Sequence, residues 1–224
     1  MIIGAAVCPA APLLAAEVTG REPVLPELRQ ACAAAVKRLA GTGPERVAVI
    51  GAGQQTATWP SSGRLDLAMF APMLGRREPA VPRPLGLGAR LLDEAGYGGP
   101  RLLQSVGADD PGAACVALGA ELARRSGRAA MLVMADGSAR RSPRAPGHFD
   151  PRAAAFDAEL ERAVRDGKPG ALRDLDESLA RELLAEGRPA WQVLAGAMPG
   201  PVPSAEVLYA DAPFGVCYLV AWLS

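Results

Sequence analysis

Histidine is almost missing from this chain of 224 residues, which contains only one, His148. Neutral imidazole is the commonest metal ligand and the usual proton shuttle near neutral pH. The chain therefore cannot build a multi-histidine iron or zinc site from this residue type. His148 lies in a polar segment before an expected helix, where a lone histidine more often faces solvent than takes part in catalysis.

Other features that the chain lacks exclude further classes of protein. Lys+Arg and Asp+Glu both number 24, so no basic surplus supports binding to nucleic acid. No apolar run reaches the roughly 18 residues that a membrane span needs. The apolar N-terminus has no positively charged start and contains Pro9 and Pro12, which argues against a secretory signal. The four cysteines are scattered without a C-x-x-C pair, which favours a reducing cytoplasm.

Short apolar runs alternate with apolar residues at helical spacing along the first 134 residues. The runs predict strands, and the helical spacing predicts helices between them. This β–α order favours a three-layer α/β sandwich with a mostly parallel central sheet flanked by helices, formed by residues 1–224 as one domain. The expected strands are 1–7, 46–50, 102–106 and 129–134, and the expected helices are 26–40, 87–95 and 113–125.

The last third of the chain has a different pattern, with helices followed by two strand-like runs. Stretches rich in proline and glycine predict long loops, which in compact domains are often functional. The expected helices are 152–166, 172–186 and 191–195, the strand-like runs are 207–209 and 215–222, and the loops are 52–63, 75–86 and 136–151.

Two motifs are too incomplete to indicate a function by themselves. Gly51 and Gly53 follow an expected strand, as in a dinucleotide-binding loop, but Thr56 occupies the position of the third glycine. A tight turn explains these glycines better. Ser138 lacks the G-x-S-x-G elbow of a serine hydrolase, and only His148 could serve as its base.

Four segments together carry a resemblance to a known family, and their order and spacing matter more than any one of them. They are Cys8-Pro-Ala-Ala-Pro-Leu-Leu14, Val47-Ala-Val-Ile-Gly-Ala-Gly-Gln54, Asp136-Gly-Ser-Ala-Arg140 with Phe149-Asp-Pro-Arg152 and Phe156-Asp157 downstream, and Asp211-Ala-Pro-Phe-Gly-Val-Cys-Tyr218. In these segments the chain resembles the catalytic subunit of class III extradiol ring-cleavage dioxygenases, and more closely the short bacterial branch of that superfamily. The similarity extends over nearly the whole chain.

The resemblance implies a ferrous iron held by two histidines and a glutamate, with a further histidine as acid/base. At the matching positions this chain has Ala10, Gly53 followed by Gln54, and Ala139, while Asp211 replaces the glutamate. A facial triad needs side-chain lone pairs, and alanine and glycine have none to donate. We therefore expect no cofactor, and no metal site beyond the remnant carboxylate of Asp211. The candidate cleft positions are Ala10, Gly53, Gln54, Asp136, Ser138, Ala139, Arg140 and Asp211.

The sequence leaves open whether the protein is an enzyme. The favoured hypothesis is a catalytically degenerate dioxygenase-like protein that binds a small ligand or a partner subunit in the inherited cleft. A second is an enzyme with altered chemistry at the same cleft, carried by Asp211, Asp136, Gln54, Ser138 or Cys8. A third is a purely structural subunit of a hetero-oligomer. For Asp211 we expect a structural or anchoring role, with its carboxylate held by Arg140 or by backbone N–H groups.

Overall fold

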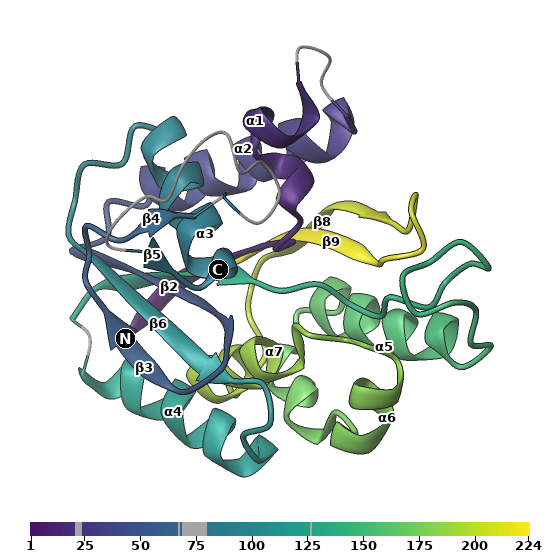
Figure 1. Ribbon diagram of the computed structural model, residues 1–224. Coiled ribbons are helices and arrows are strands. Elements are labelled where there is room, and N and C mark those ends of the chain that lie inside the picture. Colours follow the sequence, from purple (N-terminus) through teal and green to yellow (C-terminus); the bar gives the residue numbers. More distant parts are fainter. Residues whose placement is uncertain (21–23, 67, 69–79, 126) are drawn as a thin grey trace.

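The computed structural model describes residues 1–20, 24–66, 68, 80–125 and 127–224. It contains a seven-stranded sheet in the order β3-β6-β2-β7-β1-β9-β8, with helices on both faces (Figure 1). The strands are β1 (Ile2–Cys8), β2 (Arg46–Gly53), β3 (Ala57–Trp59), β6 (Arg101–Gly107), β7 (Ala129–Met134), β8 (Ala205–Asp211) and β9 (Tyr218–Leu223). Two short strands, β4 (Arg64–Leu65) and β5 (Ala80–Val81), form a separate pair.

The four strands expected from the apolar runs lie together in this sheet, which confirms that part of the prediction. β6, β2, β7 and β1 are neighbours and run parallel. Their apolar side chains reach both faces of the sheet, as required of parallel strands that are covered on both sides. In β1, for example, Ala6 and Cys8 face one core cluster, and Ala5 and Val7 face the other.

The prediction of a mostly parallel sheet is wrong, because the sheet is mixed. β3 pairs antiparallel with β6, β9 pairs antiparallel with β1, and β8 pairs antiparallel with β9. Residues 212–217, which join β8 to β9, are too few for the crossover of a dozen or more residues that parallel neighbours need. β3 lies inside the stretch expected to be a loop, 52–63, and it is too short to produce a recognisable alternation.

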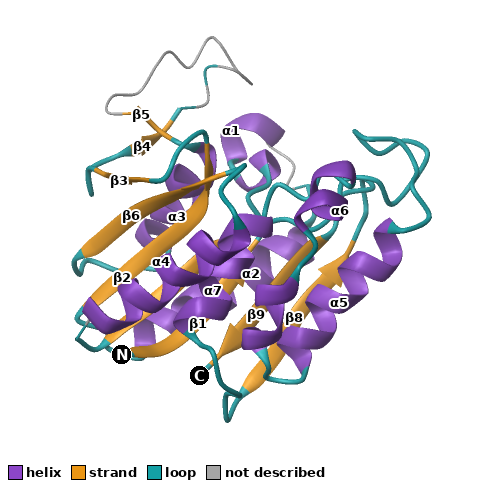
Figure 2. Ribbon diagram, turned by 90° about the horizontal axis from the view of Figure 1, so that it is seen from below, coloured by secondary structure: helices purple, strands orange, loops and turns teal. Residues whose placement is uncertain are grey.

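The helices form two layers. α1 (Ala16–Thr19), α2 (Pro26–Gly41) and α3 (Arg83–Glu94) follow the first strands, and α2 and α3 cover one face of the sheet. α4 (Gly112–Arg125), α5 (Ala153–Arg165), α6 (Glu177–Glu182) and α7 (Arg188–Ala197) lie on the other side of the sheet (Figure 2). Short 3-10 helices occupy Pro12–Leu14 and Pro169–Asp174.

Several helix boundaries differ from the prediction, and α7, for example, spans Arg188–Ala197 and not 191–195. α3 begins at Arg83 and not at Leu87, because Pro84 falls in the first helical turn, where proline is tolerated. The expected helix 172–186 is interrupted, since Asp176 caps α6 by accepting hydrogen bonds from the N–H groups of Ser178 and Leu179. Of the expected loop 75–86, residues 75–79 lie outside the described residues. The stretch 136–151 contains no helix or strand, as expected.

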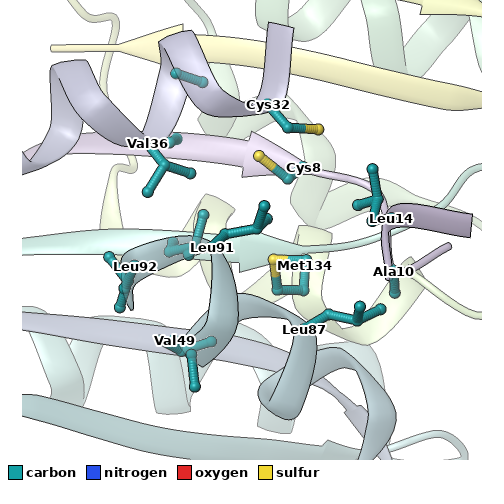
Figure 3. Packing of buried hydrophobic residues seen from close by; sticks show 14 of the residues in the cluster. Cys8, Ala10, Leu14, Cys32, Val36, Val49, Leu87, Leu91, Leu92 and Met134 are labelled. Carbon is teal, nitrogen blue, oxygen red and sulfur yellow. The ribbon is translucent and has the colours of Figure 1, made fainter. Parts of the chain in front are cut away.

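The core beneath α2 and α3 is closely packed (Figure 3). Val49 and Met134, from neighbouring strands, pack in one cluster with Leu87 and Leu92 of α3. Ala10 belongs to the same cluster and is 3% exposed. The chain just beyond β1 is therefore part of the core and not an open edge.

The opposite layer depends on two glycines where α4 crosses α7. A Cβ at Gly119 would lie 2.0 Å from the Val193 carbonyl oxygen, and one at Gly196 would lie 1.9 Å from the Val116 carbonyl oxygen. Only hydrogen fits at these two contacts. The two helix backbones therefore approach each other more closely than they could if any residue other than glycine stood at these positions.

Candidate functional site

The candidate cleft lies at the sheet edge where the parallel strands end. β1 ends at Cys8, β2 at Gly53, β6 at Gly107 and β7 at Met134. Because β8 runs in the same direction as β1, its last residue, Asp211, also lies at this edge. Open α/β sheets commonly bind ligands outside the carboxyl ends of their strands.

Ala10 and Asp136 are brought into direct contact at this edge. Cys8 and Met134 are paired residues at the ends of adjacent strands, so the two segments leave the sheet side by side. The Ala10 N–H donates a hydrogen bond of 3.0 Å to Oδ1 of Asp136. Ala10 thus takes part in this site through its backbone N–H.

A small cavity adjoins this contact. Its volume is about 60 Å³, and it is lined by Ala10, Ala52, Arg83, Pro84, Met134, Asp136, Glu186 and Gly187. Pockets for drug-sized ligands measure roughly 300–1,000 Å³. A buried water needs roughly 10–15 Å³ on this measure, so the cavity suits a few waters or a very compact ligand.

Asp136 is the titratable group of this cavity, and its side chain is half-buried. The pKa of its carboxyl is raised to about 7, mainly by burial; the nearby charge of Glu186 contributes to the rise, while Arg83 and the Ala10 N–H act in the opposite direction. Desolvation disfavours the charged carboxylate, which explains the direction of the change. Oδ2 of Asp136 accepts no hydrogen bond from any described residue. Near neutral pH this group can therefore both release and accept a proton.

The start of α3 fills the space next to β2. Arg83 forms an ion pair of 3.0 Å with Glu186, and its buried Nε has no hydrogen-bond acceptor within the described part of the chain. A Cβ at Gly53 would lie 3.0 Å from Ser105 Cβ and 3.4 Å from Pro82 Cγ. A side chain at position 53 would therefore require Ser105 to shift by a few tenths of an ångström, while Pro82 would be in ordinary contact with it.

Ser138 is buried in a polar contact that orders the chain after β7. Its N–H donates to Oδ1 of Asp157 at 2.8 Å, and its hydroxyl donates to Oδ2 at 2.7 Å. Arg141 completes the contact with an ion pair of 3.1 Å to the same carboxylate. His148 is exposed on the surface. Ser138 therefore anchors this segment to α5 and is not placed as a nucleophile.

Ala139 and Arg140 continue this ordered segment. The Ala139 N–H donates to the Leu183 carbonyl, and its own carbonyl accepts from Gly147. The Arg140 carbonyl accepts from the Asp150 N–H. The Nε of Arg140 is buried without an acceptor among the residues that the structure describes.

Asp211 and Gln54 are exposed and take no part in the small cavity. The Asp211 carboxylate accepts a hydrogen bond of 2.7 Å from the Ala212 N–H. Of the two expected ways of holding this carboxylate, the backbone N–H is the one found, and no ion pair joins it to Arg140 in the described chain. β8 is an edge strand of the sheet, so the Asp211 carboxylate at its end stays in contact with solvent.

Cys8, a further candidate for altered chemistry, is the last residue of β1 and is fully buried on the side of the sheet that α2 covers. Figure 3 places its thiol beside that of Cys32. A hydrogen bond with Cys32, together with burial, raises the pKa of the Cys8 thiol well above its usual value. The thiolate is the nucleophilic form, so this environment opposes reactivity.

The residues at the cleft do not fit the iron of the resembled family. Ala10 contributes a backbone N–H, Gly53 contributes no side chain, and Asp211 faces solvent. Within the described ranges, no three His, Cys, Asp or Glu side chains converge in a way that could hold a metal ion. We derive no chemistry through a metal at this site.

Several charged residues of the site were not predicted from the sequence. Arg83 and Glu186 line the cavity from two segments that no sequence pattern predicts to lie together. Next to the site but outside the cavity lining, Arg188 is only 3% exposed and donates to the carbonyls of Ala108 and Asp110 and to the side chain of Gln192. The available signal in the sequence was an arginine within a mostly apolar helical stretch. Such an arginine is expected to have a specific partner, because buried charges are rare unless they are paired.

No protein-family model matches the chain, and no curated protein matches it. Among solved structures, the chain is similar to the crystal structure of the uncharacterized protein JW3007 from Escherichia coli K12. The TM-score is 0.59 and the sequence identity 14%, over 99% of each chain. At this identity the similarity establishes the fold alone. Across the described residues, no helix has both the length and the apolar character that a bilayer span requires.

Proposed function

We propose that this protein is a catalytically degenerate relative of the extradiol dioxygenases that acts by binding a partner. The observation that carries the proposal is the contact between the Ala10 N–H and the Asp136 carboxylate. In the resemblance, Ala10 is compared with the first iron ligand, and a backbone hydrogen bond there supports a site without metal. The contact of 3.0 Å that a Cβ at Gly53 would make with Ser105 supports the proposal at the position compared with the second ligand.

The size of the cavity favours a macromolecular partner over an aromatic substrate. A volume of about 60 Å³ is far below what a substituted catechol and dioxygen need together. The ordered segment 136–151 lies beside this cavity and reaches the surface. Such loops on a rigid sheet are common binding elements.

The test of the non-catalytic role is metal loading followed by a ring-cleavage assay. The purified protein is incubated anaerobically with ferrous iron, desalted, analysed for iron and mixed with catechols in air. We expect no stoichiometric iron and no cleavage above a buffer blank, with an authentic extradiol dioxygenase as the positive control. One equivalent of retained iron together with ring-cleavage product would refute the proposal.

An enzyme with altered chemistry is the second candidate, favoured by the carboxyl of Asp136. A group with a pKa of about 7 beside a cavity suits a general acid or base. The test is incubation with a mixture of small metabolites followed by NMR. Consumption of a metabolite by the natural protein but not by Asp136→Asn would favour this candidate over partner binding.

We place the protein in the cytoplasm, because its four cysteines are buried and free. A binding subunit implies a homo- or hetero-oligomer. Light scattering of the purified protein alone shows whether it forms a homo-oligomer. The same measurement on extracts supplemented with tagged protein shows whether a hetero-oligomer forms.

A further inference from the structure

The segment between β7 and α5 is fixed at both sides by backbone hydrogen bonds. On one side the Ala139 N–H donates to the Leu183 carbonyl at the end of α6. On the other side the Arg141 N–H donates to the Gly215 carbonyl in the β8–β9 turn. Figure 1 shows this segment beside the β8–β9 turn. Three elements distant in sequence therefore form one continuous surface.

Large apolar side chains are exposed on this surface. Phe149 is 57% exposed, Phe214 is 48% exposed and Leu184 is 42% exposed. Among the described residues, the only other exposed large apolar side chain is Met1. Apolar side chains that gather at one place on a surface mark interaction sites.

Leu184 has a backbone conformation that favours glycine. Its φ is 53°, in the left-handed region. The Ala185 N–H donates to the Ala180 carbonyl, and the Leu184 N–H donates to the Arg181 carbonyl, which together form a Schellman motif at the end of α6. Glycine usually occupies this position because it has no Cβ. Leucine in this backbone conformation destabilises the fold. Its exposed side chain buries too little apolar surface to offset that cost.

The loop 139–152 on this surface carries a net positive charge. Residues 139–152 contain four arginines and one aspartate. Arg141 pairs with Asp157, and Arg152 pairs with Asp150 and Glu182. Arg140 and Arg144 form no ion pair within the described part of the chain. Arg144 is exposed, while Arg140 is partly buried, with its Nε enclosed. Both guanidinium groups therefore lie beside the apolar side chains without a carboxylate partner among the described residues.

We propose that these residues form a docking surface for an acidic protein segment that carries large apolar side chains. The surface, called the rim surface below, consists of Arg140, Arg144, Phe149, Leu184 and Phe214. Arginine and aromatic residues are enriched in protein interfaces. The unpaired arginines would bind carboxylates, and the apolar side chains would contact leucine or phenylalanine. This inference rests on the proposed binding function and names the chemistry of its partner.

The experiment uses fluorescence anisotropy with short labelled peptides in which phenylalanine and leucine alternate with glutamate. Matched peptides carry lysine in place of glutamate. We expect the acidic peptides to bind and the basic ones not to bind. The double variant Arg140→Glu with Arg144→Glu should weaken binding by about tenfold or more, as for interface residues of high energy. Arg124→Glu, an exposed arginine on α4, is the matched charge control and should bind as the natural protein does.

Leu184→Gly separates binding from folding. Glycine suits the left-handed backbone, so the variant should unfold at the same temperature as the natural protein or higher. Its affinity for the acidic peptides should nevertheless fall about fivefold or more.

Equal affinity for acidic and basic peptides, or unchanged affinity in the double variant, would overturn the proposal. Tighter binding to duplex DNA or to vesicles of anionic lipid than to the peptides would overturn it as well. Neither result depends on iron or on catechol cleavage, so the rim surface can fail while the proposed non-catalytic role stands.

Discussion

The carboxyl of Asp136 should make the stability of the protein depend on pH in a direction unusual for an aspartate. Its pKa is about 7 in the folded protein, while an aspartate in an unfolded chain has a pKa of about 3.9. Between these values the folded state binds more protons than the unfolded state. The free energy of unfolding therefore falls as pH rises from about 4 to about 7, and this contribution is constant outside that window.

The magnitude follows from the same two pKa values. Three pH units of difference set a ceiling of about 4 kcal/mol. Water reaches a half-buried side chain, which reduces the penalty of ionisation, so we expect about 1–3 kcal/mol. Asp136→Asn removes the ionisation and keeps Oδ1 as an acceptor for the Ala10 N–H. The variant should be more stable than the natural protein above pH 7 by this amount, and the difference should shrink toward pH 4.

The assay is urea unfolding of both proteins across this pH range. The difference between the two curves isolates Asp136, because all other groups are shared. Asp174→Asn, a substitution at an exposed carboxylate, controls for the general effect of removing one negative charge. Parallel pH profiles for the natural protein and Asp136→Asn would refute the reasoning, and would show that Asp136 is solvated in the folded state.

Three further substitutions test other parts of the structure, each by urea or thermal unfolding. Ser138→Ala should destabilise the protein by about 1–3 kcal/mol, because it leaves the buried Asp157 carboxylate short of a donor; no loss would mean that water replaces the hydroxyl. Gly119→Ala should cost about 1–3 kcal/mol or more, since α4 and α7 must separate; an unchanged melting temperature would contradict this close crossing. Asp211→Asn should change stability by no more than about 0.5 kcal/mol, as expected at an exposed position; a larger loss would indicate a role in the fold.

The parallel part of the sheet was predictable because its strands are apolar on both faces and are separated by clear helical patterns. The antiparallel part was not. β8 has an exposed end at Asp211, and β3 has only three residues, so neither carries a strong periodic signal. The direction of β9 depends on the short connection after β8, and the strand pattern says nothing about the partner with which a strand pairs.

Prediction of the site was limited in the same way. Ala10 and Asp136 each follow a strand, and adjacent parallel strands bring such positions together. Arg83 lies in the stretch expected to be a loop, 75–86. Glu186 lies beyond the end of α6, in a stretch that was expected to be one continuous helix, 172–186. Their ion pair depends on how α3 and the segment after α6 pack against the sheet, which no local pattern encodes.

A glycine or alanine at a position compared with a metal ligand leaves space that neighbouring groups can fill. Here the Ala10 N–H and the Asp136 carboxylate meet in that space, and Ser105 lies close to Gly53. A histidine placed at position 10 alone would not create an iron site, because Gly53 would still offer no side-chain ligand and Asp211 faces solvent. A histidine added at position 53 would also require Ser105 to shift. The packing of the cleft and the side chains at these positions are therefore coupled, so a change at a single position does not convert the cleft into a metal site.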